Sequence, residues 1–364
     1  MKKLANWLLL ATASLGLIAC GDKPQTTEVT AAATPQKTYQ WKMVTSWPKN
    51  FPGLGVTPEN FAKNVEAMSN GRIKIKVYGG GELVPPLEVF GSVSNGTAEV
   101  GHDAAYYAKG KLPAAQLFTA IPFGMNAQEM NGWLHYGGGM KLWEELYAPF
   151  NLIPMAGGST GNQMAGWFKK EINSIDDLKG LKMRIPGLAG EVLKRVGGVP
   201  VTLSGGELFT ALQSGTIDAT EWVGPYNDMA FGLHKAAEYY YYSPWHEPGA
   251  TLQFIFNKEA FEALPADLQA IVRVAARAAN QDMLDEYTAR NNASLNQLVN
   301  KHGVKLKKFP ADVMAKLKSA TAEVMAEQIA NDPKMKKVWD SYQAFFEQAR
   351  AYHDISEKEY YLTR

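Results

Sequence analysis

Cysteine is almost absent from this chain, which has 364 residues and a single cysteine, Cys20. One cysteine permits neither an intramolecular disulfide framework nor a cysteine-based zinc site. An excess of either charge is absent as well, because 37 Lys and Arg residues stand against 36 Asp and Glu residues. That balance, without any basic run, argues against a nucleic-acid partner. At about 150 residues per domain, the length favours two or three domains.

Short motifs of common enzyme classes are missing too. The sequence has no P-loop and no strand followed by G-x-G-x-x-G. His246-Glu247 lacks the second histidine of a zincin motif, and the six histidines show no metal-binding spacing. We therefore expect a protein that is not an enzyme. The alternatives are an extracytoplasmic metal-dependent hydrolase that uses Glu221 and Glu247, and a lipoprotein sensor.

The beginning of the chain has the pattern of an exported lipoprotein. A basic start precedes an apolar run over residues 4–19, which is short for a transmembrane helix. The run ends in Leu17-Ile18-Ala19-Cys20, which resembles a bacterial lipobox. Residues 1–19 are therefore predicted to be a lipoprotein signal peptide, with lipidation at Cys20, and residues 20–38 a flexible tether. We expect the body on the periplasmic side of a bacterial membrane, held by a lipid anchor.

Beyond the tether, the hydrophobic pattern alternates between strands and helices. Residues 41–46 and 73–77 fit strands, and residues 57–69 between them have the apolar spacing of a helix. This β-α-β order predicts a parallel sheet. Residues 267–300 predict one unusually long helix, because neither Pro nor Gly interrupts the helical spacing.

An internal repeat indicates two similar lobes. Residues 88–99 and 207–218 both follow the pattern E-[VL]-F-x-[SA]-[VL]-x-x-G-T-[AI]-[ED], which predicts a helix, a terminating glycine and a short strand. Ligands of open α/β sheets lie beyond the carboxyl ends of strands. We therefore expect the segments that follow these two strands, which include Tyr106-Tyr107 and Glu221-Trp222, to face each other across a cleft.

Two further helices are predicted over residues 311–330 and 334–352. One face of the last helix is apolar, and its members are Val338, Trp339, Tyr342, Phe345 and Phe346. These side chains pack either on their own lobe or on another subunit. Because a terminal helix seldom exposes so much apolar surface, we expect residues 334–364 to hold a homodimer together.

Polar residues at four places suggest a binding site. Arg184 ends a short predicted strand before a Pro-Gly turn, where a planar guanidinium suits bidentate capture of a carboxylate. Glu221 offers oxygens to a hard cation such as Na⁺ or Ca²⁺, and the adjacent Trp222 offers an apolar wall. Gln163, in a predicted crossing strand, and Glu247 complete the set. Taken singly, Arg184 also fits a surface or domain-interface ion pair, and the others also fit structural polar groups at strand ends.

Several segments, in their order and spacing, resemble the extracytoplasmic solute-binding proteins of tripartite ATP-independent periplasmic (TRAP) transporters. They are Ser69-Asn70-Gly71-Arg72, Gly81-Glu82-Leu83-Val84-Pro85, residues 178–187 (LKGLKMRIPG), residues 215–219 (GTIDA) and residues 256–265 (FNKEAFEALP). The resemblance covers about residues 40–350. The sequences GNQMAGWF, DATEWVGPYND and SPWHEPG, which contain Gln163, Glu221-Trp222 and Glu247, are similar to the subgroup that binds small 2-oxo or 2-hydroxy monocarboxylates with a metal ion.

The resemblance implies a role for each candidate residue. It implies that Arg184 clamps the ligand carboxylate. It also implies that Gln163, the Glu221 side chain, the Trp222 carbonyl and Glu247 surround one cation, Na⁺ or Ca²⁺, which touches the ligand. Two glutamates facing an anion would repel it without such a cation. The implied ligand is a pyruvate-like 2-oxo acid, with lactate or another 2-hydroxy acid as the alternative.

The implied partners are the TRAP permease subunits in the membrane, and the subgroup forms dimers that exchange C-terminal helices. The expected fold is α/β: a two-lobed periplasmic binding protein with a hinged cleft, a long spanning helix and C-terminal helices. Lobe I is predicted over residues 39–160 and about 252–305, lobe II over about 161–251 and 306–333, and the dimerisation helix over 334–364. The predicted ligand contacts are Arg184, Gln163, Trp222, Tyr106 and Tyr107.

Overall fold

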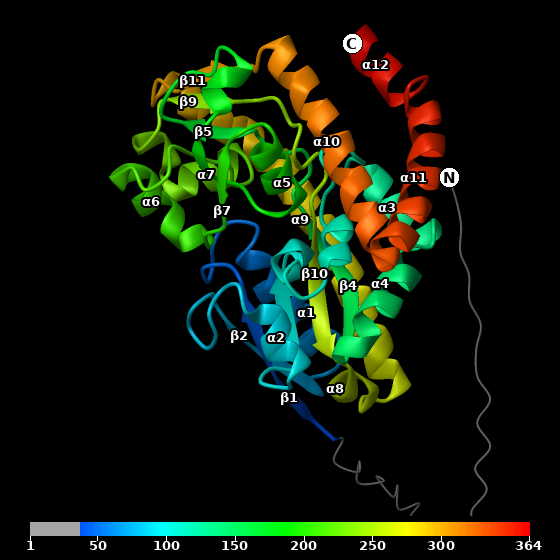
Figure 1. The fold of residues 1–364 in the computed structure, drawn as a ribbon. Coiled ribbons are helices and arrows are strands. Elements are labelled where there is room, and N and C mark those ends of the chain that lie inside the picture. Colours follow the sequence, from blue (N-terminus) through cyan, green and yellow to red (C-terminus); the bar gives the residue numbers. More distant parts are fainter. Residues whose placement is uncertain (1–36) are drawn as a thin grey trace, which may run out of the picture. The chain divides into compact units, whose positions relative to one another are not determined.

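The computed structural model describes residues 37–364, which contain two separate β-sheets (Figure 1). The predicted signal peptide, the lipidation site Cys20 and nearly all of the predicted tether lie outside the described residues. Every element named below belongs to one compact unit, Thr38–Arg364. No helix within residues 37–364 combines the length and the apolar character that crossing a membrane requires.

The first sheet has five strands in the order β2-β1-β3-β10-β4. Their bounds are β1 Tyr39–Thr45, β2 Ile73–Tyr78, β3 Val100–Asp103, β4 Leu152–Ser159 and β10 Thr251–Asn257. β1 pairs in parallel with β2 and β3, which confirms the predicted β-α-β unit, whereas β10 pairs antiparallel with β3 and β4. Phe254 and Phe256 belong to one core cluster and Ile255 to another, because successive strand side chains point to opposite faces.

Helices cover both faces of the first sheet. They are α1 Val56–Met68, α2 Val89–Ser94, α3 Ala127–Tyr136, α4 Gly139–Tyr147 and α8 Lys258–Glu262, with the 3-10 turns η1 Ala105–Ala108, η2 Pro113–Phe118 and η3 Ala148–Phe150. Phe61 and Val65 lie one turn apart on α1 and are fully buried, and Phe61 stacks on Phe254 with ring centroids 4.1 Å apart. The apolar stripe that predicted this helix is the surface that packs on the sheet.

The second sheet has six short strands in the order β11-β9-β5-β8-β6-β7. Their bounds are β5 Gly166–Phe168, β6 Lys182–Arg184, β7 Val199–Val201, β8 Ala219–Thr220, β9 Tyr239–Tyr241 and β11 Lys305–Lys307. The helices of this half are α5 Gly187–Arg195, α6 Leu208–Ser214, α7 Pro225–Phe231 and α10 Ala311–Asn331, with the turns η4 Ile175–Leu178, η5 Gly205–Glu207 and η6 Leu233–Lys235. β6 lies in parallel with both β7 and β8, so the carboxyl ends of these strands share one edge.

The internal repeat forms the same local structure in both halves, as predicted. After α2 the chain turns at Gly96, which has a φ of 79°, and continues into β3. After α6 it turns at Gly215, which has a φ of 81°, and continues into β8. Glycine adopts this left-handed conformation without the steric cost of a side chain. Each copy therefore ends in a short strand whose exit carries candidate site residues.

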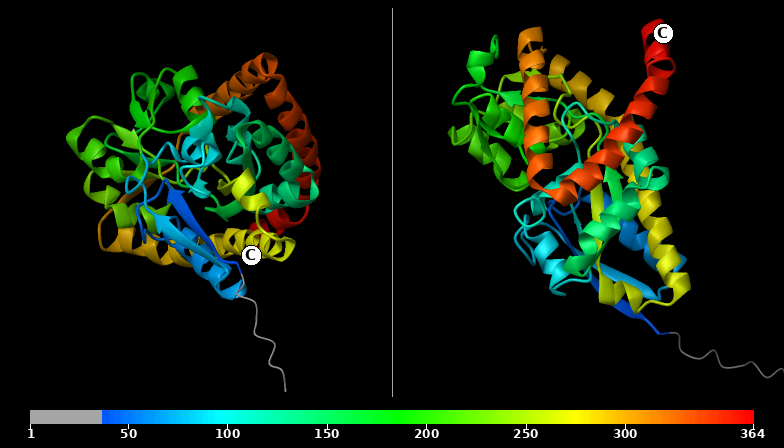
Figure 2. Two further views of the ribbon diagram at one scale, coloured as in Figure 1. Left: turned by 90° about the horizontal axis from the view of Figure 1, so that it is seen from below. Right: turned by 45° about the vertical axis from the view of Figure 1, so that its right-hand side comes forward.

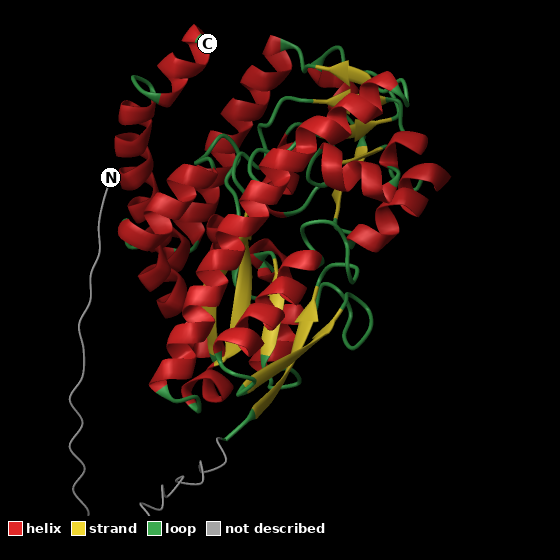
Figure 3. Cartoon of the chain, turned by 180° about the vertical axis from the view of Figure 1, so that it is seen from behind, coloured by secondary structure: helices red, strands yellow, loops and turns green. Residues whose placement is uncertain are grey.

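One helix connects the two halves. α9 (Ala266–Asn300) runs for 35 residues, which confirms the predicted long helix. Leu268 and Val272 pack in the core of the first sheet, whereas Leu298 packs in a cluster with Trp167 of the second sheet. In Figure 3, which shows the molecule from behind, this long helix runs in front of the strands of both halves. The same helix is therefore a structural support for both halves.

The C-terminal helices pack on the chain itself. α10 lies on α5, and α11 (Pro333–His353) lies on η2, α3 and α4. Val338 and Tyr342 of α11 are only 2% and 1% exposed, and the Tyr342 hydroxyl accepts a hydrogen bond of 2.6 Å from the Met125 N–H. Val338 and Tyr342 of the predicted apolar face are therefore covered by the same chain, whereas Trp339, Phe345 and Phe346 are only partly buried. The homodimer stays a prediction. A short helix that was not predicted, α12 (Glu357–Thr363), follows and projects from the body (Figure 2).

Candidate functional site

Strand register brings the first two site residues together. Arg184 is the last residue of β6 and is paired with Thr220 of β8, so Glu221 leaves its strand at the same edge. Both side chains are 1% exposed, and Arg184 Nη1 forms an ion pair with Glu221 Oε1. The predicted strand-end position of Arg184 is confirmed. Its partner is a buried carboxylate from the neighbouring strand rather than a surface group.

Hydrogen bonds and an aromatic ring fix the position of the Arg184 guanidinium. Nε donates to the Leu203 carbonyl and Nη2 to the Tyr107 hydroxyl, each at 3.2 Å. Its central carbon lies 5.0 Å from the ring centroid of Trp222, a cation–π arrangement. Burial by itself would lower the pKa of Arg184, but the charge of Glu221 holds that pKa above its ordinary value. Arg184 is therefore a fixed positive charge at the centre of the site.

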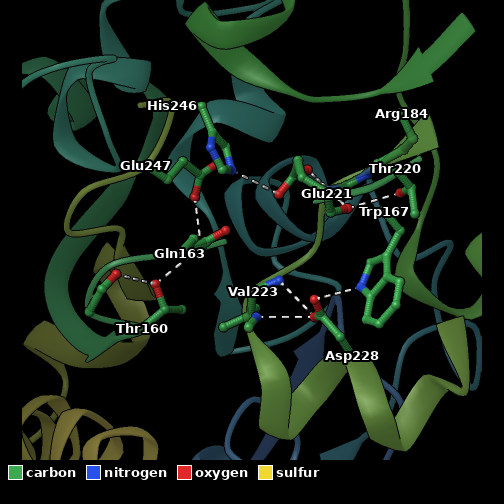
Figure 4. A network of polar contacts seen from close by, with 12 residues as sticks. Thr160, Gln163, Trp167, Arg184, Thr220, Glu221, Val223, Asp228, His246 and Glu247 are labelled. Atoms are coloured by element: carbon green, nitrogen blue, oxygen red, sulfur yellow. Dashed lines mark hydrogen bonds and ion pairs between the residues drawn. The ribbon is translucent and has the colours of Figure 1, made fainter. Parts of the chain in front are cut away.

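Two more titratable groups lie beside Glu221. One ligand atom from each of Glu221, His246 and Glu247 lies within 4.8 Å of the others, and His246 Nε2 is 3.5 Å from Glu221 Oε2. Figure 4 shows these three side chains converging. Burial, and next the charge of Glu221, raise the pKa of Glu247 well above its ordinary value. A cation bound nearby would lower the pKa of Glu247 again, because a positive charge favours the ionised carboxylate.

Gln163 joins Glu247 from a different segment than predicted. It lies between β4 and β5 rather than in a crossing strand, because the chain turns at Gly161, with a φ of 66°, and β5 begins only at Gly166. Its Nε2 donates to Glu247 Oε2 at 2.8 Å and to Thr160 Oγ1 at 3.1 Å. Its Oε1 is buried and has no hydrogen-bond partner among residues 37–364. Both amide donors are thus in use while the acceptor is free.

The first half supplies two tyrosines. Tyr106 and Tyr107 lie in η1, and their rings meet edge to face with centroids 4.8 Å apart. Burial raises the pKa of Tyr107 to about 12, and the pKa of Tyr106 is also raised, first by burial and next by Glu247. Both hydroxyls therefore stay protonated at neutral pH. The structure thus places Tyr106, Tyr107, Gln163, Arg184, Glu221, Trp222 and Glu247 in one neighbourhood.

Sequence reasoning missed two residues. His246 was passed over because it lacks a second histidine at metal-binding spacing, although it adjoins Glu247 in the chain. Asp228 in α7 supports the turn after Trp222: its Oδ1 accepts from the N–H groups of Val223 and Gly224 at 3.2 and 3.1 Å. Its Oδ2 accepts from Trp167 Nε1 at 3.0 Å and from a tyrosine hydroxyl. Burial raises the pKa of Asp228 to about 6. The sequence pattern that could have identified Asp228 is an acidic residue in the first turn of a helix that begins at Gly-Pro.

The donor set suits a hard cation. Carboxylate and amide oxygens are the ligands that Na⁺ and Ca²⁺ prefer, and Glu221, Glu247 and the unpaired Oε1 of Gln163 offer them within a buried cluster. Histidine nitrogen suits transition metals better, so His246 fits a neighbour of the site more than a ligand. One arginine and two glutamates together can hold a cation and a carboxylate side by side.

Two α/β halves, joined by a long helix and enclosing a buried charged site to which both contribute, define a two-lobed solute-binding protein. Comparison with known families agrees: the profile of "bacterial extracellular solute-binding protein, family 7" (DctP) matches residues 43–332. The chain belongs to this family and is an extracytoplasmic solute-binding protein of the TRAP type. The resemblance found in the sequence and the expected α/β two-lobed fold are both confirmed.

Three similar proteins bear on the ligand. A "monocarboxylate 2-oxoacid-binding periplasmic protein" of Nostoc sp. is 43% identical over 99% of this chain and 97% of its own length. A TRAP periplasmic solute-binding protein of Pseudoalteromonas atlantica, solved with bound sodium and pyruvate, is 43% identical with a TM-score of 0.88. One of Colwellia psychrerythraea, solved with calcium and pyruvate, is 44% identical with the same TM-score of 0.88. Each alignment to these two structures covers 90% of this chain and all of the other.

Proposed function

We propose that this protein captures a small 2-oxo monocarboxylate, pyruvate or a close analogue, together with one Na⁺ or Ca²⁺ ion. The observation that carries the proposal is the buried arrangement of Arg184 next to Glu221, Glu247 and Gln163. Pyruvate with either cation in structures 43% and 44% identical to this chain supports it. A carboxylate ligand can pair with the positive charge of Arg184. A metal ion can neutralise the two glutamates of the cluster.

Each site residue has a distinct part in this proposal. Arg184, oriented by Leu203 and Tyr107, holds the ligand carboxylate. Glu221, Glu247, Gln163 Oε1 and the Trp222 carbonyl hold the cation, which neutralises the glutamates. Tyr106, Tyr107 and the Trp222 indole wall the ligand, and Asp228 positions the backbone turn that carries Trp222.

Binding requires the two halves to open and close, because the site residues are almost fully buried. Closure would bring Tyr107 of the first half against Arg184 of the second and sequester the ligand from water. The closed form would then deliver the acid to the permease subunits of a TRAP transporter. Lobe I over residues 39–160 and about 252–305, and lobe II over about 161–251 and 306–333, are the proposed moving bodies.

Titration calorimetry tests the ligand and the cation together. The protein, dialysed free of metal and sodium, should bind pyruvate weakly, and adding either Na⁺ or Ca²⁺ should restore tight binding. Acetate, which has the carboxylate but no 2-oxygen, is the matched control and should bind poorly with every ion. Tight pyruvate binding that is indifferent to all cations would leave the acidic cluster without its proposed role. No binding of any 2-oxo acid would refute the function itself.

The proposal extends to anchoring and assembly. A lipid at Cys20 would tether the body to the membrane. The C-terminal segment would hold a homodimer, through its far end rather than through the covered face of α11. Tyr352, Ile355, Tyr360 and Leu362 support this, because they are between 62% and 76% exposed. A protein truncated after residue 353 should sediment as a monomer while the full chain sediments as a dimer.

A further inference from the structure

Trp47 is a buried aromatic residue at the site to which no role has been given. It follows the end of β1 and is 2% exposed. Its ring meets that of Trp222 edge to face, with centroids 6.0 Å apart, and lies 6.2 Å from that of Tyr107. These two neighbours are the residues whose ring and hydroxyl contact the Arg184 guanidinium. Trp47 therefore lies directly behind the groups that surround the proposed anion clamp.

The orientation of Trp47 is set by a buried histidine. The indole Nε1 donates a hydrogen bond of 2.8 Å to His102 Nδ1, and His102 Nε2 lies 3.0 Å from the Gly157 carbonyl. An indole N–H can only donate, so Nδ1 is the acceptor and Nε2 carries the proton that is given to Gly157. Burial lowers the pKa of His102 to about 4, which keeps this neutral form at physiological pH.

The backbone at this position is fixed as well. The Trp47 carbonyl accepts hydrogen bonds from the Gly80 N–H at 2.8 Å and the Thr45 hydroxyl at 3.1 Å. Because the only polar atom of the indole is directed to His102, the surface that Trp47 presents toward Trp222 and Tyr107 is carbon. These hydrogen bonds hold the carbon surface of Trp47 against Trp222 and Tyr107.

We propose that Trp47, positioned by His102, supports the rings of Trp222 and Tyr107 from behind, so that this rigid apolar wall limits the carbon chain of the ligand and selects short 2-oxo acids over long or branched ones. This inference rests on the proposed function and deepens it. Trp47 is a positioning residue that acts through Trp222 and Tyr107, and His102 is a positioning residue that acts through Trp47. A wall of this kind discriminates by size, because one methylene group too many in a closed pocket costs a factor of about ten or more in binding.

The test compares two acids in several variants by calorimetry, with saturating sodium or calcium. The ratio of the dissociation constants of 4-methyl-2-oxopentanoate and pyruvate measures size selectivity. Trp47→Ala should lower this ratio by about tenfold. His102→Leu, which leaves the indole without its acceptor, should lower it by about threefold. His102→Gln, whose amide can accept from Nε1 and donate to Gly157, should retain the wild-type ratio.

Trp41→Ala is the matched control. Trp41 is also a buried tryptophan of the first sheet, but it packs against Phe256, away from the site. It should lower thermal stability and leave the ratio unchanged. If Trp47→Ala does not fold, Trp47→Phe takes its place, with an expected shift of about threefold from the lost hydrogen bond.

Equal weakening of both acids in the Trp47 variants would overturn the inference, because Trp47 would then be part of the core only. A wild-type protein that binds neither acid would instead refute the proposed function, and this inference with it. The two failures are distinguishable, since the second is visible without any variant.

Discussion

Arg184→Met removes the one buried positive charge of the site while keeping a side chain of similar length. In the structure, Arg184 is 1% exposed and forms an ion pair with Glu221, which is equally buried. Breaking a buried pair from one side leaves an uncompensated charge and typically destabilises a protein by about 3 kcal/mol or more. Ligand binding should suffer in addition, because the ligand carboxylate loses a charge-assisted hydrogen bond. That loss is about 2 kcal/mol, or about thirtyfold in the dissociation constant.

The measurement pairs calorimetry of pyruvate binding, with the cation at saturation, with urea unfolding of the same samples. Arg195→Met is the matched control. Arg195 is another arginine of the same half, but it is 37% exposed in its ion pairs with Glu323 and Glu327. Such exposed pairs contribute about 1 kcal/mol at most, so both binding and stability should change little. A folded Arg184→Met protein that binds pyruvate within a factor of three of the wild type would refute the assignment of the carboxylate clamp.

Three further predictions concern the cation, the response to pH and the anchor. Gln163→Leu removes the unpaired amide oxygen and should raise the sodium or calcium concentration needed for pyruvate binding by about tenfold. Gln116→Leu, at another buried glutamine with an unpaired oxygen, should leave that requirement unchanged. The pKa of His102 is lowered from 6.5 to about 4, so the unfolded chain takes up a proton before the folded one as the pH falls through this range. The free energy of unfolding should therefore drop by about 3 kcal/mol between pH 6.5 and 4. Urea titrations should show a flatter profile for His102→Gln, and parallel profiles would contradict the argument. Cys20→Ser should abolish acylation and membrane association, as followed by fractionation and mass spectrometry. A chain beginning near Tyr39 should bind pyruvate as the full protein does; an unmodified Cys20 in soluble wild-type protein would disprove the anchor.

Local sequence patterns were enough to predict much of the fold. The repeated helix, glycine and strand could be predicted because a left-handed turn at Gly96 and Gly215 has a strong local preference for glycine. The long helix of residues 266–300 likewise follows from helical spacing without a breaker. Both features depend only on residues that are close together in the sequence, so they can be predicted from the sequence alone.

Features that depend on distant parts of the chain were harder to predict. Gln163 was predicted in a strand, but the turn at Gly161 and hydrogen bonds from its backbone and side chain to Glu247 hold it in an irregular segment. The apolar face of α11 could equally cover its own lobe or a partner, and only the position of α3 decides between them. His246 belongs to the acidic cluster only because the fold places it beside Glu221, which lies 25 positions earlier in the chain.

The placement of β10 has a consequence for the order in which the protein folds. This strand lies between β3 and β4 in the first sheet, and its Gln253 bonds to Asp103, 150 positions earlier in the chain. A growing chain therefore cannot complete its first sheet until residue 257 has been made, after most of the second half. Contacts across such sequence separations slow folding. For a protein that works outside the cytoplasm, such a delay favours an unfolded chain during synthesis, which is the state that export machinery engages.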